Sequence, residues 1–295
     1  MKIISSVYSN IELNKIIDYA DGFILMIKPH AICYGDIDIE SAINTIKSKN
    51  KMVILGLNKI YHPNDIKALD ELLNKYKDDN DIYFYLSDLG ACNLCIDKNI
   101  SNRIIYNPET MITNYLDLGI LQNYKFDAYQ MSSEITIADL KLAYEKTNAD
   151  LFYYGFGHKI MFYSRRQLIS LYKNKTNIDM PLEKGYLKES TREDFIPITE
   201  NENGTYILRS YVISLLEDIN KLDFLKYLYL DSNYVDFDKY ITVLKAYYDY
   251  NNKKISLKEA LNIINELNLD IQDGFKNNDT VYLKEELKLW VNLNY

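Results

Sequence analysis

Two polar clusters, each directly after an aromatic-rich apolar run, decide the fold. They lie in Asp127-Ala-Tyr-Gln-Met-Ser-Ser-Glu-Ile-Thr136 and Asp150-Leu-Phe-Tyr-Tyr-Gly-Phe-Gly-His-Lys159, with a helix-like segment between them. Each apolar run has the composition of a buried strand. If the two runs are neighbouring parallel strands, both polar clusters emerge at the same edge, where parallel α/β proteins bind their ligands. The stretch therefore predicts a βαβ unit with a site at its strand ends.

The same alternation of strand-like and helix-like segments continues along most of the chain. The expected strands are Lys2–Val7, Gly22–Ile27, Met52–Asn58, Ile82–Ser87, Arg103–Tyr106, Asp127–Met131, Leu151–Gly155 and Lys226–Leu230. Eight βα units in about 250 residues predict an α/β fold of the TIM-like (β/α)8 barrel type. No Gly-x-Gly-x-x-Gly follows any of these strands, which argues against an open dinucleotide-binding sheet.

The spacing also predicts how the chain is divided. Residues 1–250 are expected to form the barrel, with a long insertion at 171–209 before the last strand. Asn203-Gly204 predicts a hairpin turn inside the insertion, and residues 210–221 have a helical pattern. Residues 251–295 are expected to be a short C-terminal α+β extension packed on the barrel, with an aromatic segment from Thr280.

Composition limits the function classes. A net charge of −8 and a pI of about 5.1 argue against a nucleic-acid binder that uses its whole surface. Lys159, Arg165 and Arg166 form a local basic patch, so RNA stays open as a partner. No run approaches the ~20 apolar residues of a membrane helix, and the first residues do not resemble a secretory signal. Three cysteines do not suggest a disulfide framework, and we expect a cytoplasmic protein.

In such a barrel, the residues just after each strand share one mouth. These are Asn58, Ser87, Asp88, Asn107, Ser132 to Glu134, Gly155 to His158, and Asp231 to Asn233. Glu134 is a candidate general base, metal ligand or substrate anchor; alternatively it is an acidic residue in the capping turn of the next helix. His158 follows a Gly-Phe-Gly turn, and its imidazole could act near neutral pH or be merely structural.

Arginine and cysteine give two further hypotheses. Arg165 or Arg166 would suit capture of a carboxylate, although adjacent side chains seldom point the same way. Cys92 and Cys95 form a C-x-x-C, and with Cys33 and His30 they are candidate ligands for zinc or an iron–sulfur cluster. The i, i+3 spacing of Cys92 and Cys95 equally fits packing on one face of a helix.

Several motifs occur in an order that resembles the collagenase-like peptidases of family U32, over essentially the whole chain. The motifs are Leu86-Ser-Asp-Leu-Gly90, Tyr106-Asn-Pro-Glu-Thr-Met-Ile-Thr-Asn114, Met131-Ser-Ser-Glu-Ile-Thr-Ile-Ala-Asp139, Gly155-Phe-Gly-His-Lys-Ile-Met-Phe-Tyr-Ser-Arg-Arg166, Phe195-Ile-Pro-Ile-Thr-Glu-Asn-Glu-Asn-Gly-Thr205 and Asp273-Gly-Phe-Lys-Asn-Asn-Asp-Thr-Val-Tyr282. The resemblance implies a TIM-like barrel and peptidase activity. It also keeps Glu134, Tyr163 and Asn114 among the candidate site residues.

Some members of that family hydroxylate RNA or quinone precursors without oxygen, using an iron–sulfur cluster held by cysteines. Here Gln167 stands where a cysteine commonly follows the Ser-x-Arg element, so a cluster is not expected, while a divalent metal stays open. The leading hypothesis is a peptidase in which Glu134 and His158 act on a peptide held by Arg165 or Arg166. The alternative is a non-hydrolytic U32-type protein that binds a small carboxylate and takes part in oxygen-independent hydroxylation of RNA or quinone precursors. A third hypothesis is an inactive subunit of a homo- or hetero-oligomer with another U32-type chain.

Overall fold

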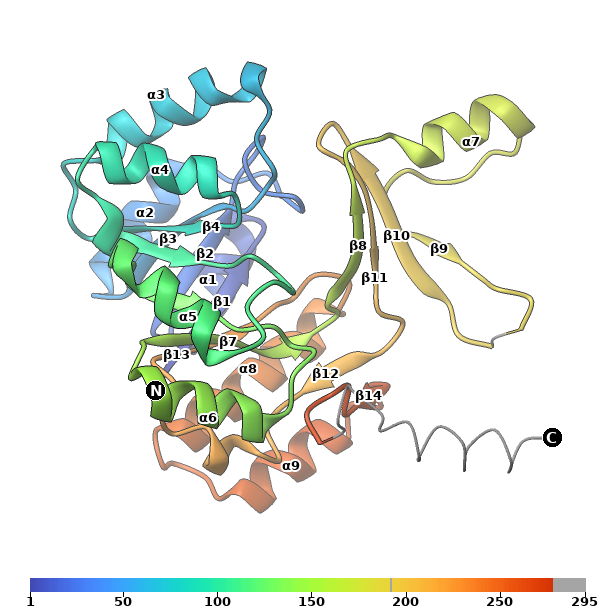
Figure 1. The fold of residues 1–295 in the computed structure, drawn as a ribbon. Coiled ribbons are helices and arrows are strands. Elements are labelled where there is room, and N and C mark those ends of the chain that lie inside the picture. The colour runs from blue at the N-terminus through green and yellow to red at the C-terminus, as the bar shows by residue number, and fades with distance from the viewer. Residues whose placement is uncertain (192, 278–295) are drawn as a thin grey trace, which may run out of the picture.

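Eight parallel strands close into a barrel at the centre of the protein (Figure 1). The structure is a computed structural model that describes residues 1–191 and 193–277. The barrel strands are β1 (Lys2–Val7), β2 (Gly22–Met26), β3 (Met52–Leu57), β4 (Ile82–Leu86), β5 (Ile104–Tyr106), β6 (Ala128–Gln130), β7 (Leu151–Gly157) and β13 (Tyr227–Leu230). β13 pairs in parallel with both β1 and β7, which closes the ring. The predicted TIM-like barrel is confirmed.

The barrel strands are buried on both faces, and their side chains alternate between two cores. Ile24 and Met26 of β2 point into the barrel, whereas Phe23 and Leu25 pack against the surrounding helices. Such strands are nearly continuous apolar runs in the sequence, as parallel sheets require. The interior is rich in aromatic rings; the Phe152 and Tyr229 rings, for example, lie 5.4 Å apart between centroids.

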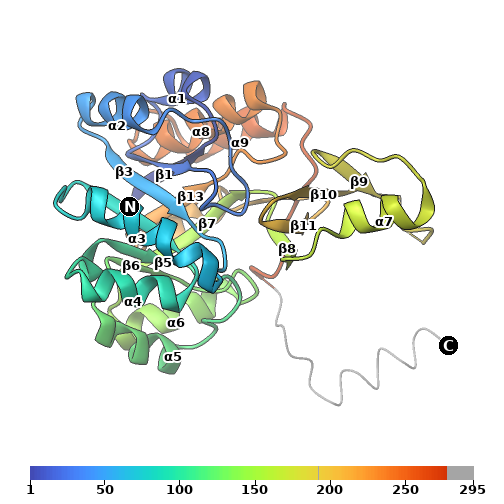
Figure 2. The same cartoon turned by 90° about the horizontal axis from the view of Figure 1, so that it is seen from above.

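Helices surround the barrel and follow its strands in order (Figure 2). They are α1 (Asn10–Ile16), α2 (Ile39–Ser48), α3 (Ile66–Tyr76), α4 (Leu89–Asp97), α5 (Tyr115–Leu121), α6 (Ile137–Thr147) and α8 (Phe237–Asn251). Short 3-10 helices cover Pro63–Asp65, Ser101–Arg103, Gln122–Tyr124 and Ile219–Lys221. Local sequence fixes several starts: Thr136 and Asp139 form a capping box at α6, for instance. None of the helices in the described residues has the length and apolar character that a membrane crossing requires.

An antiparallel sheet of four strands projects from the barrel between β7 and β13, and we call it the arm (Figure 1). Its order is β8 (Ile160–Ser164), β11 (Gly204–Leu208), β10 (Ile196–Asn201) and β9 (Gly185–Leu187), with α7 (Leu168–Thr176) beside it. The hairpin expected around Asn203-Gly204 is confirmed by β10 and β11. The sheet includes β8, which lies before the residue 171 at which the insertion was expected to begin.

The turn of that hairpin fixes the arm to the barrel. Asn203 Nδ2 donates hydrogen bonds of 3.0 and 2.9 Å to the carbonyl oxygens of Pro29 and Ala31, in the loop after β2. Asn201 Nδ2 donates a third, of 2.9 Å, to the carbonyl oxygen of Ile32. Because these side-chain amides donate hydrogen bonds to the backbone carbonyl groups of a barrel loop, they hold the arm beside the carboxyl ends of the barrel strands.

The helix predicted over residues 210–221 is wrong. Val212–Ser214 instead form β12, which pairs antiparallel with the end of β7 and buries its side chains there. The pairing partner is far away in sequence, so local periodicity did not reveal it. α9 (Leu257–Asn265) and β14 (Ile271–Gln272) follow, and β14 extends the sheet through β12. The aromatic segment predicted from Thr280 lies outside the described residues.

Candidate functional site

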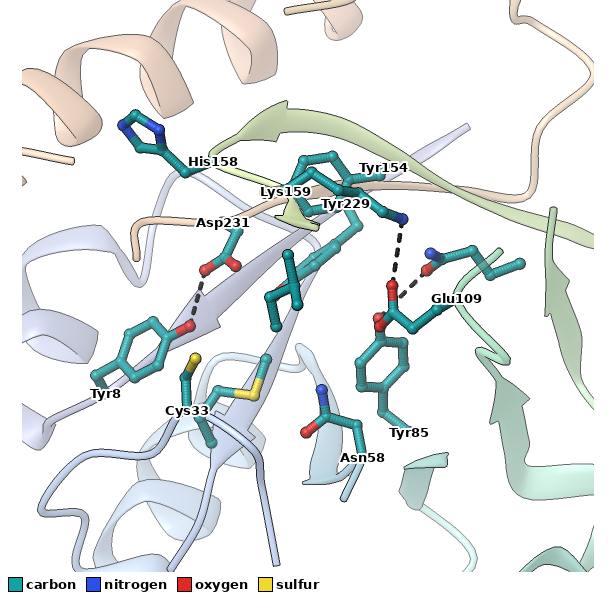
Figure 3. A pocket seen from close by; sticks show the side chains of 13 residues that line it. Tyr8, Cys33, Asn58, Tyr85, Glu109, Tyr154, His158, Lys159, Tyr229 and Asp231 are labelled. Carbon is teal, nitrogen blue, oxygen red and sulfur yellow. Dashed lines mark hydrogen bonds and ion pairs between the residues drawn. The ribbon is translucent and has the colours of Figure 1, made fainter. Parts of the chain in front are cut away.

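A small cavity lies at the carboxyl ends of the barrel strands, and we call it the mouth cavity (Figure 3). The space open to water is about 30 Å³, enough for about two water molecules. Its lining is mainly polar and aromatic: Tyr8, Met26, Cys33, Asn58, Tyr85, Glu109, Gln130, Tyr154, His158, Lys159, Ile160, Tyr229 and Asp231. A small functional group, such as a carbonyl or carboxylate, matches a space of this size.

Asp231, directly after β13, is held by three donors on one carboxylate oxygen. Ser6 Oγ, the Tyr8 hydroxyl and the Asn233 backbone N–H donate to Oδ1 over 2.8, 2.9 and 3.1 Å. Among the described residues, none donates a hydrogen bond to Oδ2. Burial raises the pKa of Asp231, and these hydrogen bonds offset part of that rise. Asp231 therefore has a fixed orientation, one oxygen available to water, and a greater proton affinity than an ordinary aspartate.

Lys159 and Tyr154 supply two donors that the protein does not satisfy. The Lys159 side chain is 4% exposed, and its Nζ lies 3.3 Å from Glu109 Oε2. Lys159 and Glu109 are thus close enough for an ion pair, but their geometry is not that of a hydrogen bond. Among the described residues, neither Lys159 Nζ nor the buried Tyr154 hydroxyl has a hydrogen-bond partner. Burial, followed by the charge of Asp231, raises the pKa of Tyr154, so the phenol keeps its proton. Buried donors without partners are costly, and a ligand oxygen would satisfy them.

Glu109 is positioned by its own loop. Asn107 Nδ2 donates to Glu109 Oε1 over 2.8 Å, and the Glu109 N–H donates to Asn107 Oδ1 over 3.0 Å. Glu109 has φ of +58°, in the left-handed region that residues other than glycine seldom adopt. In this conformation the Glu109 carboxylate lies beside Lys159.

His158 lines the same cavity, but its ring points away from Lys159 and Glu109 (Figure 3). Its Nδ1 lies 2.9 Å from the carbonyl oxygen of Arg209. Since a carbonyl only accepts, Nδ1 donates, which fixes the tautomer and leaves Nε2 as the other functional atom. His158 is therefore at the rim of the cavity rather than beside Lys159 Nζ and Glu109.

A larger cavity of about 390 Å³ shares Tyr8 and Cys33 with the mouth cavity. It continues to residues of the arm, including Lys184 and Tyr206. The two cavities therefore adjoin at Tyr8 and Cys33, beside the arm.

Glu134 and the two arginines are not brought together at the mouth. The Glu134 side chain is 48% exposed, and its nearest cation is Arg209, at 3.8 Å. Arg165 Nη2 pairs with Asp65 Oδ2 at 3.4 Å, and Arg166 is exposed. None of the three lines the mouth cavity. The described residues therefore do not form the site that was expected from Glu134 and an arginine.

The other predicted binding residues have mainly structural contacts. Asn58 lines the cavity, but its Oδ1 accepts from the Ile32 N–H over 3.1 Å. Asp88 caps α4 and Asn114 caps α5 through their side-chain oxygens. The Tyr163 hydroxyl donates to the carbonyl oxygen of Asn203 over 2.8 Å, which joins β8 to the turn between β10 and β11.

The cysteines do not form the ligand set that the sequence allowed. Cys92 and Cys95 are buried in the hydrophobic core on α4, as i, i+3 packing predicts, whereas Cys33 lies at the mouth. Burial raises the pKa of all three thiols, to about 12 for Cys95. No group of three or more His, Cys, Asp or Glu in the described ranges could hold a metal ion. The residues present therefore do not fit an iron–sulfur cluster.

The residues that sequence reasoning missed have few local signals. Tyr8, Tyr85 and Tyr154 are indistinguishable in the sequence from core aromatic residues. Asp231 was among the residues expected at the mouth because it follows a strand, and only its hydrogen bonds now distinguish it. Glu109 lies beyond the strand end, in a loop whose conformation could not be anticipated.

Comparison with known proteins supports the earlier resemblance. The model of Peptidase family U32 matches residues 35–286, which includes most of the barrel and the whole arm. A search of curated proteins finds no match. The match covers well over half of the chain and the barrel has the expected architecture, so the protein belongs to Peptidase family U32.

Proposed function

We propose that this protein hydrolyses peptide bonds at the mouth cavity, with Asp231 rather than Glu134 as the general base. The observation that carries the proposal is the pairing of an oriented carboxylate with two unsatisfied donors in one small cavity. Carbonyl hydrolysis needs these elements: a base for water, and donors for the oxygen that becomes negative. The family assignment supports the same activity. We also propose that the protein acts in the cytoplasm.

The chemistry assigns each group one step. Oδ2 of Asp231 accepts a proton from water, and the resulting hydroxide forms a bond to the carbonyl carbon of the scissile amide. The carbonyl oxygen takes the negative charge and receives hydrogen bonds from the Tyr154 hydroxyl and Lys159 Nζ. When the C–N bond breaks, the proton held by Asp231 goes to the leaving amine. Glu109 holds Lys159 in place through their ion pair.

Hydrolysis of a defined peptide mixture, followed by mass spectrometry, tests the proposal with a pair of isosteric variants. Asp231→Asn removes the base, and we expect cleavage to fall at least ~100-fold, as is typical for loss of a general base. Glu134→Gln is the matched control, and we expect it to retain the parent rate because Glu134 lies outside the cavity. The opposite pattern, with loss only in Glu134→Gln, would restore Glu134 as the base.

A second candidate function is binding of a small carboxylate without hydrolysis, and the size of the cavity favours it. A carboxylate can use both donors at once and fits within about 30 Å³. Native mass spectrometry of the freshly purified protein tests this candidate. A retained anion of low mass, absent from Tyr154→Phe, together with no cleavage of any peptide, would favour binding over hydrolysis.

A further inference from the structure

The strand β8 leads directly from the mouth cavity and has an unpaired edge. His158 and Lys159 line the cavity just before β8, and Ile160, its first residue, lines the cavity as well. β8 pairs with β11 on one side. On its other side, no strand among residues 1–191 and 193–277 pairs with it. A row of backbone donors and acceptors thus starts at the site and runs outward along the arm.

The side chains of β8 show that both faces of the strand are partly uncovered. Met161 is 55% exposed and Phe162 is 44% exposed, although successive residues of a strand point to opposite faces. The other edge strand of the arm, β9, has only three residues and is flanked by Lys184 and Lys188. Short length and flanking lysines protect an edge from pairing. β8 has five residues and a bulge at Met161, and the two basic residues that flank it are held by carboxylates: Lys159 by Glu109 and Arg165 by Asp65.

We propose that the substrate is an extended polypeptide segment that pairs with the outer edge of β8 and places its carbonyl group in the mouth cavity. This inference rests on the proposed function, because it uses the same cavity for the reacting group. Main-chain pairing with a strand edge is a general mode of peptide recognition, and it tolerates many side chains. The substrate class is therefore defined by an extended backbone more than by sequence.

The direction of the peptide follows from the direction of β8. The strand runs away from the mouth, from Lys159 toward Ser164. Antiparallel pairing is the more stable arrangement, and it makes the bound peptide run toward the mouth. Residues on the amino side of the scissile bond would then lie along β8. Exposed Met161 and Phe162 would contact apolar side chains of the peptide, and the exposed Arg166 beyond the strand favours an acidic residue farther upstream.

The test compares a long and a short product-like ligand by fluorescence polarisation and calorimetry. The long probe is Glu-Val-Ser-Val-Ser-Ala, which carries fluorescein on its amino terminus and has a free carboxylate, and the short probe is N-acetylalanine. We expect the hexapeptide to bind at least ~10-fold more tightly, as several backbone hydrogen bonds would give. Met161→Pro should abolish that gain and leave the affinity for N-acetylalanine unchanged. In the β8–β11 pairing, Ile160 is paired with Leu208 and Phe162 with Ile207, so Met161 between them has no paired residue in β11. Proline at Met161 therefore interrupts no residue pair of the sheet.

Tyr186→Pro, on the opposite edge strand β9, is the matched control and should bind both probes like the parent protein. A second measurement leaves the protein intact: N-methylation of the hexapeptide, one residue at a time, should weaken binding only at every second position. The inference is overturned if Met161→Pro binds the hexapeptide like the parent, if Tyr186→Pro weakens it equally, or if N-methylation shows no alternation. An amide-terminated hexapeptide separates the two proposals. If it binds as tightly as the acid while Met161→Pro still matters, the edge is correct and the role of the mouth donors is wrong.

Discussion

Tyr154→Phe should separate ligand binding from folding, because its hydroxyl is buried without a partner in the described residues. Removing that hydroxyl breaks no hydrogen bond of the folded protein and removes a desolvated polar group. We therefore expect the free energy of unfolding to stay equal or to rise by about 1 kcal/mol. A hydrogen bond to a charged carboxylate is worth about 1.5–3 kcal/mol, which corresponds to a loss of affinity of about 10- to 150-fold. N-Acetylalanine, titrated by calorimetry, measures that loss.

The neighbouring Tyr153→Phe is a matched control with the opposite expectation. The Tyr153 hydroxyl donates to the carbonyl oxygen of Ser132 over 3.4 Å, and its ring packs outside the barrel strands. Its removal should cost about 0.5–1 kcal/mol of stability and leave affinity unchanged. The reasoning is refuted if Tyr154→Phe binds N-acetylalanine like the parent protein, or if both variants lose the same stability in thermal unfolding.

Three further outcomes follow from the mouth cavity and its surroundings. Burial raises the pKa of Asp231, and the base acts in its unprotonated form. As the pH is lowered, kcat/KM should therefore begin to fall at a higher pH than it would with an ordinary aspartate as the base. A profile that is flat down to pH ~4 contradicts this. A raised carboxyl pKa means that the folded state binds the proton more tightly than the unfolded state, so ionised Asp231 lowers stability at neutral pH. Asp231→Asn should raise Tm at pH 7 and lose this advantage below the pKa of the unfolded state, whereas equal Tm differences at both pH values would exclude the linkage. Gly157 has φ of +128°, and an added Cβ would lie 2.6 Å from both the Asp231 carbonyl oxygen and the Tyr154 hydroxyl. Gly157→Ala should therefore lower the free energy of unfolding, measured with denaturant, by about 2–3 kcal/mol. The control Gly119→Ala meets no neighbour within 4 Å inside α5 and should gain about 0.5–1 kcal/mol.

The barrel could be predicted because each parallel strand is itself an apolar run with a helix after it. Leu151–Gly157 and Tyr227–Leu230 are recognisable without knowing that they pair. The site was less predictable because it depends on which way side chains turn after the strands end. Glu134 follows its strand as Asp231 does, yet Glu134 turns outward to Arg209, while Ser6 and Tyr8 hold Asp231 inward. Those contacts join opposite ends of the sequence, which no local pattern records.

The closure of the ring by β13 makes the mouth cavity depend on the integrity of one short segment. Four residues, Tyr227–Leu230, complete the barrel between β1 and β7, and Asp231 follows them immediately. Any opening event that releases this last strand also removes Asp231 from the mouth cavity. During synthesis, Asp231 leaves the ribosome only after the entire arm, so an incomplete chain lacks the proposed base.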